Sequence, residues 1–152
     1  MEEPKVPPAE ELRFRCRLAT RWVDEDVHGV LNNAVFLTLL EEARYAYFAG
    51  LSLLDGNRFP FLLRQTNVRF VHPGSGGRAV EVALGTVVLG RSSLVQAYRV
   101  SDPAQDDRVL CEAEAVLVIY DGYERRSVPM SEAFRAAVEA YEGRSLSAGQ
   151  GS

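Results

Sequence analysis

The segment that most constrains this chain is residues 33–50, where apolar side chains recur at spacings of three and four residues. That spacing is the period of an α-helix. The apolar positions are Val35, Phe36, Leu39, Leu40, Ala43, Tyr47 and Phe48. Because they form a wide face, we predict a helix that is largely wrapped by the rest of the protein. Gly50 is a suitable C′ residue to end it.

An acidic, glycine-containing loop, residues 24–32, precedes this helix and follows the end of a strand. The loop places the carboxylate of Asp26 a few residues before the helix begins. The first turn of a helix has free N–H groups and carries a partial positive charge. Acyl-transfer chemistry needs an acid or base close to a group that stabilises an anion. The loop and the helix start are therefore a candidate catalytic site.

Most of the remaining chain has the alternation typical of β-strands. The strand-like runs are residues 12–22, 66–72, 79–89, 92–101 and 109–120. Short connections separate the last three, so we expect them to be antiparallel neighbours. Several positions in these runs are unusually small, which lets a sheet approach and curl around another element. They are Ala83, Gly85, Ala97, Ala113 and Ala115.

A second, shorter helix is predicted near the end of the chain, with Ser131 as its N-cap and its end near Gly143. The connector at residues 51–64 is too apolar for a free loop, so it should cover a core edge or a subunit contact. The element order is one strand, one long helix, four strands and one short helix. This order predicts an α+β fold with an antiparallel sheet and one buried helix.

Length and composition limit the organisation and the partners of the chain. Its 152 residues suit a single domain, which we assign to residues 11–142. The flanking residues 1–10 and 143–152 are expected to be disordered tails. The net charge of -4, without long basic runs, argues against nucleic acid or an anionic membrane as a partner. No apolar run reaches the length of a membrane span.

The cysteines and histidines exclude further classes of site. Cys16 and Cys111 occupy strand-like apolar positions, so we interpret them as reduced core residues of a cytoplasmic protein. The two histidines, His28 and His72, lack the spacing of metal ligands. The N-terminus has no apolar stretch typical of a signal peptide. We therefore expect no metal site.

Three motifs now indicate a family. The loop reads D-x-D-x-x-G-x-x-N-N-A, formed by Asp24, Asp26, Gly29, Asn32, Asn33 and Ala34. Glu41-Glu42-Ala43-Arg44 follows on the helix, and Gly90-Arg91-Ser92-Ser93-Leu94 follows later. With these motifs, residues 11–141 resemble the hot-dog thioesterases, and specifically the 4-hydroxybenzoyl-CoA thioesterase family.

The resemblance implies a hot-dog fold, in which an antiparallel five-stranded sheet wraps around one long central helix. It also implies a homodimer, or a homotetramer made of two dimers, with the active site at the dimer interface. The expected activity is that of an acyl-CoA thioesterase, which hydrolyses an acyl-CoA thioester to a carboxylic acid and free CoA. No metal or redox cofactor is expected, since CoA is part of the substrate.

The resemblance assigns catalysis to Asp26, either as a nucleophile or as a general base for water. The backbone N–H of Asn33 would polarise the thioester carbonyl, although Asn32 and Asn33 could equally serve as plain N-caps. Asp24 is expected to hold the loop by hydrogen bonds. No histidine occupies a usual family position, which leaves Asp26 as the main chemical group and Glu42 as the fallback.

Six residues are predicted to bind substrate: His28, Gly29, Arg69, Arg91, Ser92 and Ser93. His28 and Gly29 lie in the loop beside Asp26. Arg91, Ser92 and Ser93 lie at a hairpin that lines the pantetheine tunnel in the family. Arginine suits the nucleotide phosphates because it can form paired hydrogen bonds.

Two other functions stay open at this point. A thioester dehydratase shares the fold but usually needs a histidine at the site. A hot-dog module that only binds acyl-CoA or acyl carrier protein would need no catalytic group. The sequence does not define the acyl group, which could be short, long or aromatic.

Overall fold

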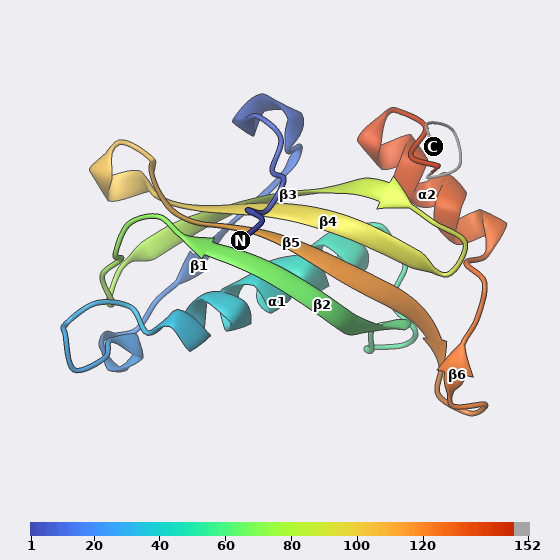
Figure 1. The fold of residues 1–152 in the computed structure, drawn as a ribbon, viewed down its shortest axis with the longest axis horizontal. Coiled ribbons are helices and arrows are strands. Elements are labelled where there is room, and N and C mark those ends of the chain that lie inside the picture. The colour runs from blue at the N-terminus through green and yellow to red at the C-terminus, as the bar shows by residue number, and fades with distance from the viewer. Residues whose placement is uncertain (148–152) are drawn as a thin grey trace.

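The computed structural model describes residues 1–147 and has one antiparallel sheet with two α-helices (Figure 1). The main strands are ordered β1-β3-β4-β5-β2, and β6 pairs with the end of β5. The elements are β1 (Phe14–Ala19), α1 (Asn33–Gly50), β2 (Phe61–Phe70), β3 (Ala79–Leu89), β4 (Ser93–Asp102), β5 (Arg108–Asp121), β6 (Arg126–Ser127) and α2 (Glu132–Glu142). The predicted hot-dog fold, a five-stranded antiparallel sheet around a long helix, is confirmed.

Helix α1 begins at Asn33, as predicted, and lies along one face of the sheet (Figure 1). Its core residues include Phe36, Leu40 and Phe48, each at most 2% exposed. On β5, Ala113 and Ala115 belong to the same buried cluster. Their small side chains leave room for the helix against the sheet, as the composition of the strands predicted.

Two boundaries differ from the sequence-based prediction. Gly50 is the last helical residue and not the C′ residue; the left-handed residue after the helix is Ser52, with φ of 58°. Strand β1 ends at Ala19, and Trp22 begins the short 3-10 helix η2 (Trp22–Asp24), where it is 78% exposed. The chain leaves the strand because Arg21 and Asp24 cap each other's backbone across η2.

Strand β2 is longer than predicted, because it begins at Phe61 inside the apolar connector. Phe61 is buried, whereas Leu62 and Leu63 are exposed at an edge of the sheet. The expected alternation fails here because the pairing of β2 with β5 has an irregularity between Leu63 and Gln65.

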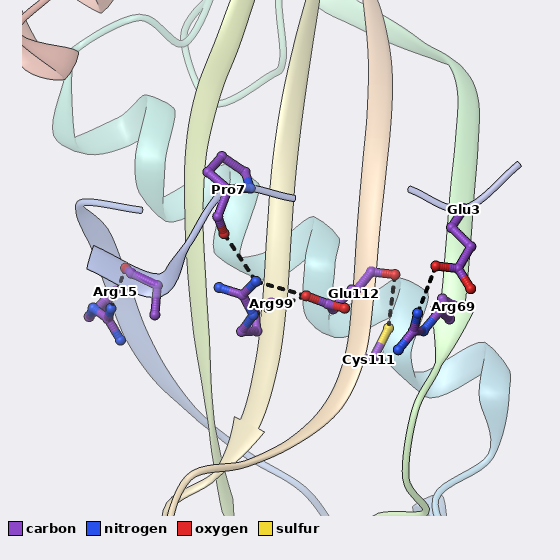
Figure 2. Close-up of polar contacts among 8 residues, drawn as sticks. Glu3, Pro7, Arg15, Arg69, Arg99, Cys111 and Glu112 are labelled. Atoms are coloured by element: carbon purple, nitrogen blue, oxygen red, sulfur yellow. Dashed lines mark hydrogen bonds and ion pairs between the residues drawn. The ribbon is translucent and has the colours of Figure 1, made fainter. Parts of the chain in front are cut away.

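The N-terminal residues, expected to form a disordered tail, cross the outer face of the sheet (Figure 2). Arg15, Arg99 and Arg69 lie on alternate positions of a cross-strand row, with Ala83 and Glu112 between them. They hydrogen bond to the carbonyls of Ala9 and Pro7 and to the Glu3 carboxylate, respectively. These arginines hold the N-terminal segment against the sheet, and its composition alone did not predict these contacts.

Helix α2 runs from Glu132 to Glu142, and both of its predicted caps are confirmed. The Ser131 hydroxyl accepts a hydrogen bond from the Phe134 N–H, and Gly143 has φ of 73°. Of the predicted C-terminal tail, Leu146 is buried and its carbonyl accepts from Leu89 N–H. Residues 148–152 lie outside the described part of the chain.

Candidate active site

Backbone hydrogen bonds close the loop before α1 into a tight turn. The Asp26 N–H donates to the Val30 carbonyl at 2.8 Å, and the Gly29 N–H donates to the Asp26 carbonyl at 3.0 Å. Gly29 closes the turn with φ of 73°, a conformation that favours glycine. Because the Leu31 N–H donates to the Gly74 carbonyl, the loop is also fixed to the connection between β2 and β3.

Asp24 anchors the loop, as the sequence predicted. Its carboxylate accepts from the Arg21 backbone N–H at 2.8 Å and forms an ion pair with the Arg21 side chain. Hydrogen bonding from Arg21 holds the pKa of Asp24 below its usual value. The Asp24 carbonyl accepts from the Asn32 N–H at 2.9 Å, which ties both ends of the loop together at the start of α1.

The Asp26 carboxylate has one oxygen committed and one available. Oδ1 accepts from the His28 N–H at 2.8 Å, whereas Oδ2 has no hydrogen bond within residues 1–147. Asp26 is half-buried, and the His28 side chain is exposed. The backbone of His28 therefore orients the carboxylate and leaves its second oxygen without a partner in the described chain.

One backbone donor is free at the start of α1. The Ala34 N–H donates to the Asn32 side chain at 3.0 Å, and the Val35 N–H donates to the Asn32 carbonyl at 2.9 Å. For Asn33 N–H, no acceptor is present in the described chain. Asn32 is thus the N-cap, which leaves Asn33 as the available donor and removes Ala34 from that role.

Asn33 opens onto a small pocket of about 250 Å³ that it shares with Phe36 on α1 and Phe70 at the end of β2. The rings of Phe36 and Phe70 are 5.7 Å apart. The fallback residue Glu42 lies elsewhere, in a pocket of about 430 Å³ beside Asp24. The pocket at the end of β2 is therefore lined by the helix start, which carries the free N–H, and not by Glu42.

The predicted CoA-binding residues do not lie with Asp26 within one chain. Arg69 is paired with Glu3 on the outer face of the sheet, because its neighbour Phe70 occupies the helix side. Arg91, Ser92 and the start of β4 at Ser93 form the hairpin after β3. Strand β3 has 11 residues, so this hairpin lies about 35 Å from the strand end that holds the loop.

A second cleft, which the sequence analysis missed, lies between α1 and β2. It has a volume of about 540 Å³ and is lined by Leu37, Thr38, Leu40, Glu41, Arg44, Phe59, Phe61, Leu62, Leu63 and Thr66. Arg44 is only 4% exposed. Its position four residues after Leu40 and three before Tyr47 places it on the apolar face of the helix, and this spacing was the available signal.

Residues 1–147 contain no group of three or more His, Cys, Asp or Glu side chains arranged to hold a metal ion. No helix in this part of the chain has the length and apolarity needed to cross a membrane. Both cysteines are free, and Cys111 is buried.

Comparison with known proteins places the chain in a family. The model of the thioesterase-like superfamily matches residues 20–138. A thioesterase from Thermus thermophilus, solved with coenzyme A and zinc, is 35% identical, with a TM-score of 0.75 over 86% of this chain and 95% of that one. A search of curated proteins finds no match.

Two more distant structures share the fold. A 1,4-dihydroxy-2-naphthoyl-CoA thioesterase from Synechocystis is 20% identical, with a TM-score of 0.72 over 82% of this chain and 94% of that one. The 4-hydroxybenzoyl-CoA thioesterase from a Pseudomonas species is 19% identical, with a TM-score of 0.72 over 81% and 96%. The predicted enzyme class, a thioester hydrolase, is confirmed, and the chain belongs to the thioesterase-like superfamily with the hot-dog fold.

Proposed function

We propose that the protein is an acyl-CoA thioesterase that uses Asp26 as its catalytic carboxylate and the Asn33 N–H as its oxyanion donor. One observation carries the proposal: a carboxylate with a free oxygen and a helix start with a free N–H are joined by the same hydrogen-bonded loop. The Thermus relative, solved with coenzyme A, supports CoA as the thiol part of the substrate.

Two routes are consistent with this arrangement. As a nucleophile, Asp26 Oδ2 attacks the thioester carbon, the C–S bond breaks, and CoA leaves as a thiolate; water then hydrolyses the resulting anhydride. As a general base, Asp26 removes a proton from water, which attacks the same carbon. In both routes negative charge develops on the carbonyl oxygen, where the Asn33 N–H and the helix start stabilise it.

The complete site is proposed to need two chains. Strand β2 is an edge of the sheet and exposes Leu62, Leu63 and Phe70. Antiparallel pairing of two β2 edges would bring the Phe61 end of one copy to the Phe70 end of the other. The Arg91 hairpin lies at the Phe61 end and Asn33 at the Phe70 end, so the pairing would join them.

In this arrangement the CoA nucleotide would lie against Arg91, Ser92 and Ser93 of the second copy, while His28 and Gly29 border the thioester. Arg69 would contact phosphate only after leaving Glu3. We propose a homodimer, or a homotetramer of two such dimers, acting in the cytoplasm, where both cysteines stay free.

The test is release of CoA thiol from a panel of short, long and aromatic acyl-CoAs by the purified protein, with the oligomeric state measured by light scattering. Hydrolysis of at least one acyl-CoA by a dimer or tetramer is the expected result. Binding without turnover would instead indicate a binding module, and reversible loss of water from a 3-hydroxyacyl-CoA would indicate a dehydratase. A stable monomer with full activity would contradict the two-chain site.

A further inference from the structure

The cleft between α1 and β2 contains a buried cation that has no anionic partner within residues 1–147. Only the Nε of Arg44 has a hydrogen bond, to the Tyr98 hydroxyl at 2.8 Å, and no carboxylate forms an ion pair with the guanidinium. A buried charge is costly unless it is paired. The structure therefore leaves the two Nη groups of Arg44 without the anion that would normally accompany them.

A chain of side chains fixes Arg44 from behind. Arg44 donates to Tyr98, Tyr98 to Gln96, Gln96 to Thr86, Thr86 to Tyr47, and Tyr47 to Glu142. All five bonds are between 2.6 and 3.1 Å long, and all donate in the same direction, toward the Glu142 carboxylate. Bonds aligned in this way strengthen one another. The chain uses Nε alone, so it orients the guanidinium without occupying Nη1 or Nη2.

Arg44 also stacks on its anchor, because its Cζ lies 5.3 Å from the centre of the Tyr98 ring. This cation–π contact restricts the guanidinium further. Thr66 also lines the cleft, but its Oγ1 is buried from solvent and makes no hydrogen bond within the described chain. The two Nη groups of Arg44 are therefore unused donors in an otherwise mostly apolar cleft, an arrangement typical of a ligand site.

The position of Arg44 limits the size of the ligand. It lies 11 residues after Asn33, which is about 16 Å along the helix axis at 1.5 Å per residue. Helical side chains lean toward the helix N-terminus, which shortens the distance to the guanidinium. The cleft itself begins near Leu37, one turn beyond Asn33. An acyl chain of about eight carbons spans this interval.

We propose that this cleft selects acyl groups that end in a carboxylate, with Arg44 binding that carboxylate through its two Nη groups. The walls of Leu37, Leu40 and Phe61 would hold the methylene chain, and the second copy of the proposed dimer, paired along Leu62 and Leu63, would close the cleft. A carboxylate fits better than a neutral end group because guanidinium and carboxylate can form two parallel hydrogen bonds. This inference rests on the proposed thioesterase activity and defines its substrate class.

Glu41 offers a way to sharpen the proposal. It lines the same cleft and makes no ion pair with Arg44. Its negative charge disfavours a second carboxylate nearby. Glu41→Gln should therefore improve the kcat/KM for a dicarboxylic substrate more than for a monocarboxylic one of the same length.

The main experiment compares suberoyl-CoA with octanoyl-CoA, which have equal chain length and differ in the terminal carboxylate. Wild-type protein should prefer suberoyl-CoA. Arg44→Met should lower its kcat/KM by about 10- to 100-fold, the range for hydrogen bonds to charged groups, and change octanoyl-CoA by less than about threefold. Arg44→Lys, which keeps the charge, should retain part of the preference. Arg58→Met, which removes an exposed arginine near the cleft, is the matched control and should leave the preference intact.

A second readout separates this inference from the thioesterase proposal. Calorimetry with free suberate and free octanoate measures the subsite without any hydrolysis, and suberate binding should be lost in Arg44→Met. If no acyl-CoA is hydrolysed but suberate binding depends on Arg44, the activity proposal fails and the subsite stands.

An equal loss of kcat/KM for suberoyl-CoA and octanoyl-CoA in folded Arg44→Met protein would overturn the subsite. Suberate binding that is unchanged in both Arg44→Lys and Arg44→Met would also overturn it. So would dissociation of the dimer by Arg44→Met with unchanged selectivity, because Arg44 would then pair with a carboxylate of a second copy. Thermal melting of each variant establishes that it is folded.

Discussion

The start of α1 and its middle present polar groups in opposite ways. At the start, Asp26 is half-buried and held by one backbone bond, and the nearby donor is a backbone N–H. In the middle, Arg44 is enclosed and held by a chain of buried side chains that ends at Glu142. The first region can change its charge with little effect on the core, whereas the second cannot.

Because of this difference, the two regions of the helix are suited to different functions. The helix start offers partial charge that does not depend on any side chain, which suits stabilisation of a transient oxyanion. The helix middle offers a full charge that depends on several side chains, which suits recognition of a fixed group on a ligand. Substitutions at the start should therefore change turnover, and substitutions in the middle should change stability and selectivity.

The largest expected effect is at the helix start. Asp26→Asn keeps the hydrogen bond from His28 N–H but removes the nucleophile or base. The turnover number should fall by about 10²- to 10⁴-fold, with KM and the urea unfolding midpoint nearly unchanged. Steady-state kinetics and urea titration of the same preparation provide the check. Glu42→Gln is the control and should stay within a few-fold of the parent; the reverse pattern would move the chemistry to Glu42.

The next largest effect is expected in the helix middle. Tyr47→Phe removes the hydroxyl that accepts from Thr86 Oγ1 and donates to Glu142, and it leaves the buried Thr86 hydroxyl without its acceptor. Unfolding free energy should fall by about 1–3 kcal/mol, while turnover changes far less than in Asp26→Asn. Urea unfolding followed by circular dichroism measures this. Tyr45→Phe, on the more exposed side of α1, is the matched control. Equal stability of the two variants would contradict the buried chain.

The central helix, the antiparallel strands and both caps of α2 could be predicted because local periodicity and capping residues determine them. Asn33 as the first helical residue and Ser131 as N-cap follow from such local signals. The burial of Arg44 could not be read from residue type, because arginine is usually exposed. Its partner Tyr98 lies 54 residues away, on β4, and only the folded sheet brings the two together.

In the candidate site, too, local contacts could be predicted from the sequence, whereas contacts between distant segments could not. Asp24 and Asp26 lie in one loop, so their hydrogen bonds to backbone are local and predictable from the motif. The separation of Arg91 from Asp26 depends on the direction and length of β3, which sequence similarity alone does not provide. The placement of Arg69 against Glu3 depends on a terminal segment whose composition predicted disorder.

A smaller effect is expected at the hairpin after β3, which is proposed to bind the nucleotide of CoA. Arg91→Ala should raise KM for an acyl-CoA a few-fold, since an exposed ion pair is worth less than about 1 kcal/mol. It should leave the N-acetylcysteamine thioester of the same acyl group unchanged, because that substrate lacks the nucleotide. Arg108→Ala, which removes another exposed arginine, is the control. Equal effects on both substrates would exclude phosphate recognition by Arg91.

Mixing variants tests the two-chain arrangement directly. A mixed dimer of Asp26→Asn and Arg91→Ala subunits contains one site with both residues intact if the site spans two copies. Activity at low substrate concentration should then exceed the mean of the two parent variants after subunit exchange. Activity at the mean would place both residues in a site within one chain.

The smallest expected effect concerns the anchor of the loop. The ion pair and hydrogen bonds with Arg21 lower the pKa of Asp24 in the folded protein. A depressed folded pKa contributes stability above the unfolded pKa, which is near 3.8. This contribution disappears as the pH falls through the folded pKa. Asp24→Asn should therefore be less stable than the parent at pH 7, and the difference should shrink as the pH drops below 4. Urea unfolding at several pH values measures it, with Asp55→Asn as the control for an exposed carboxylate in a turn. If the difference in unfolding free energy does not change with pH, Asp24 acts through the shape of the loop and not through its charge. That result would weaken the contrast between a helix start that acts through electrostatics and a helix middle that depends on side chains.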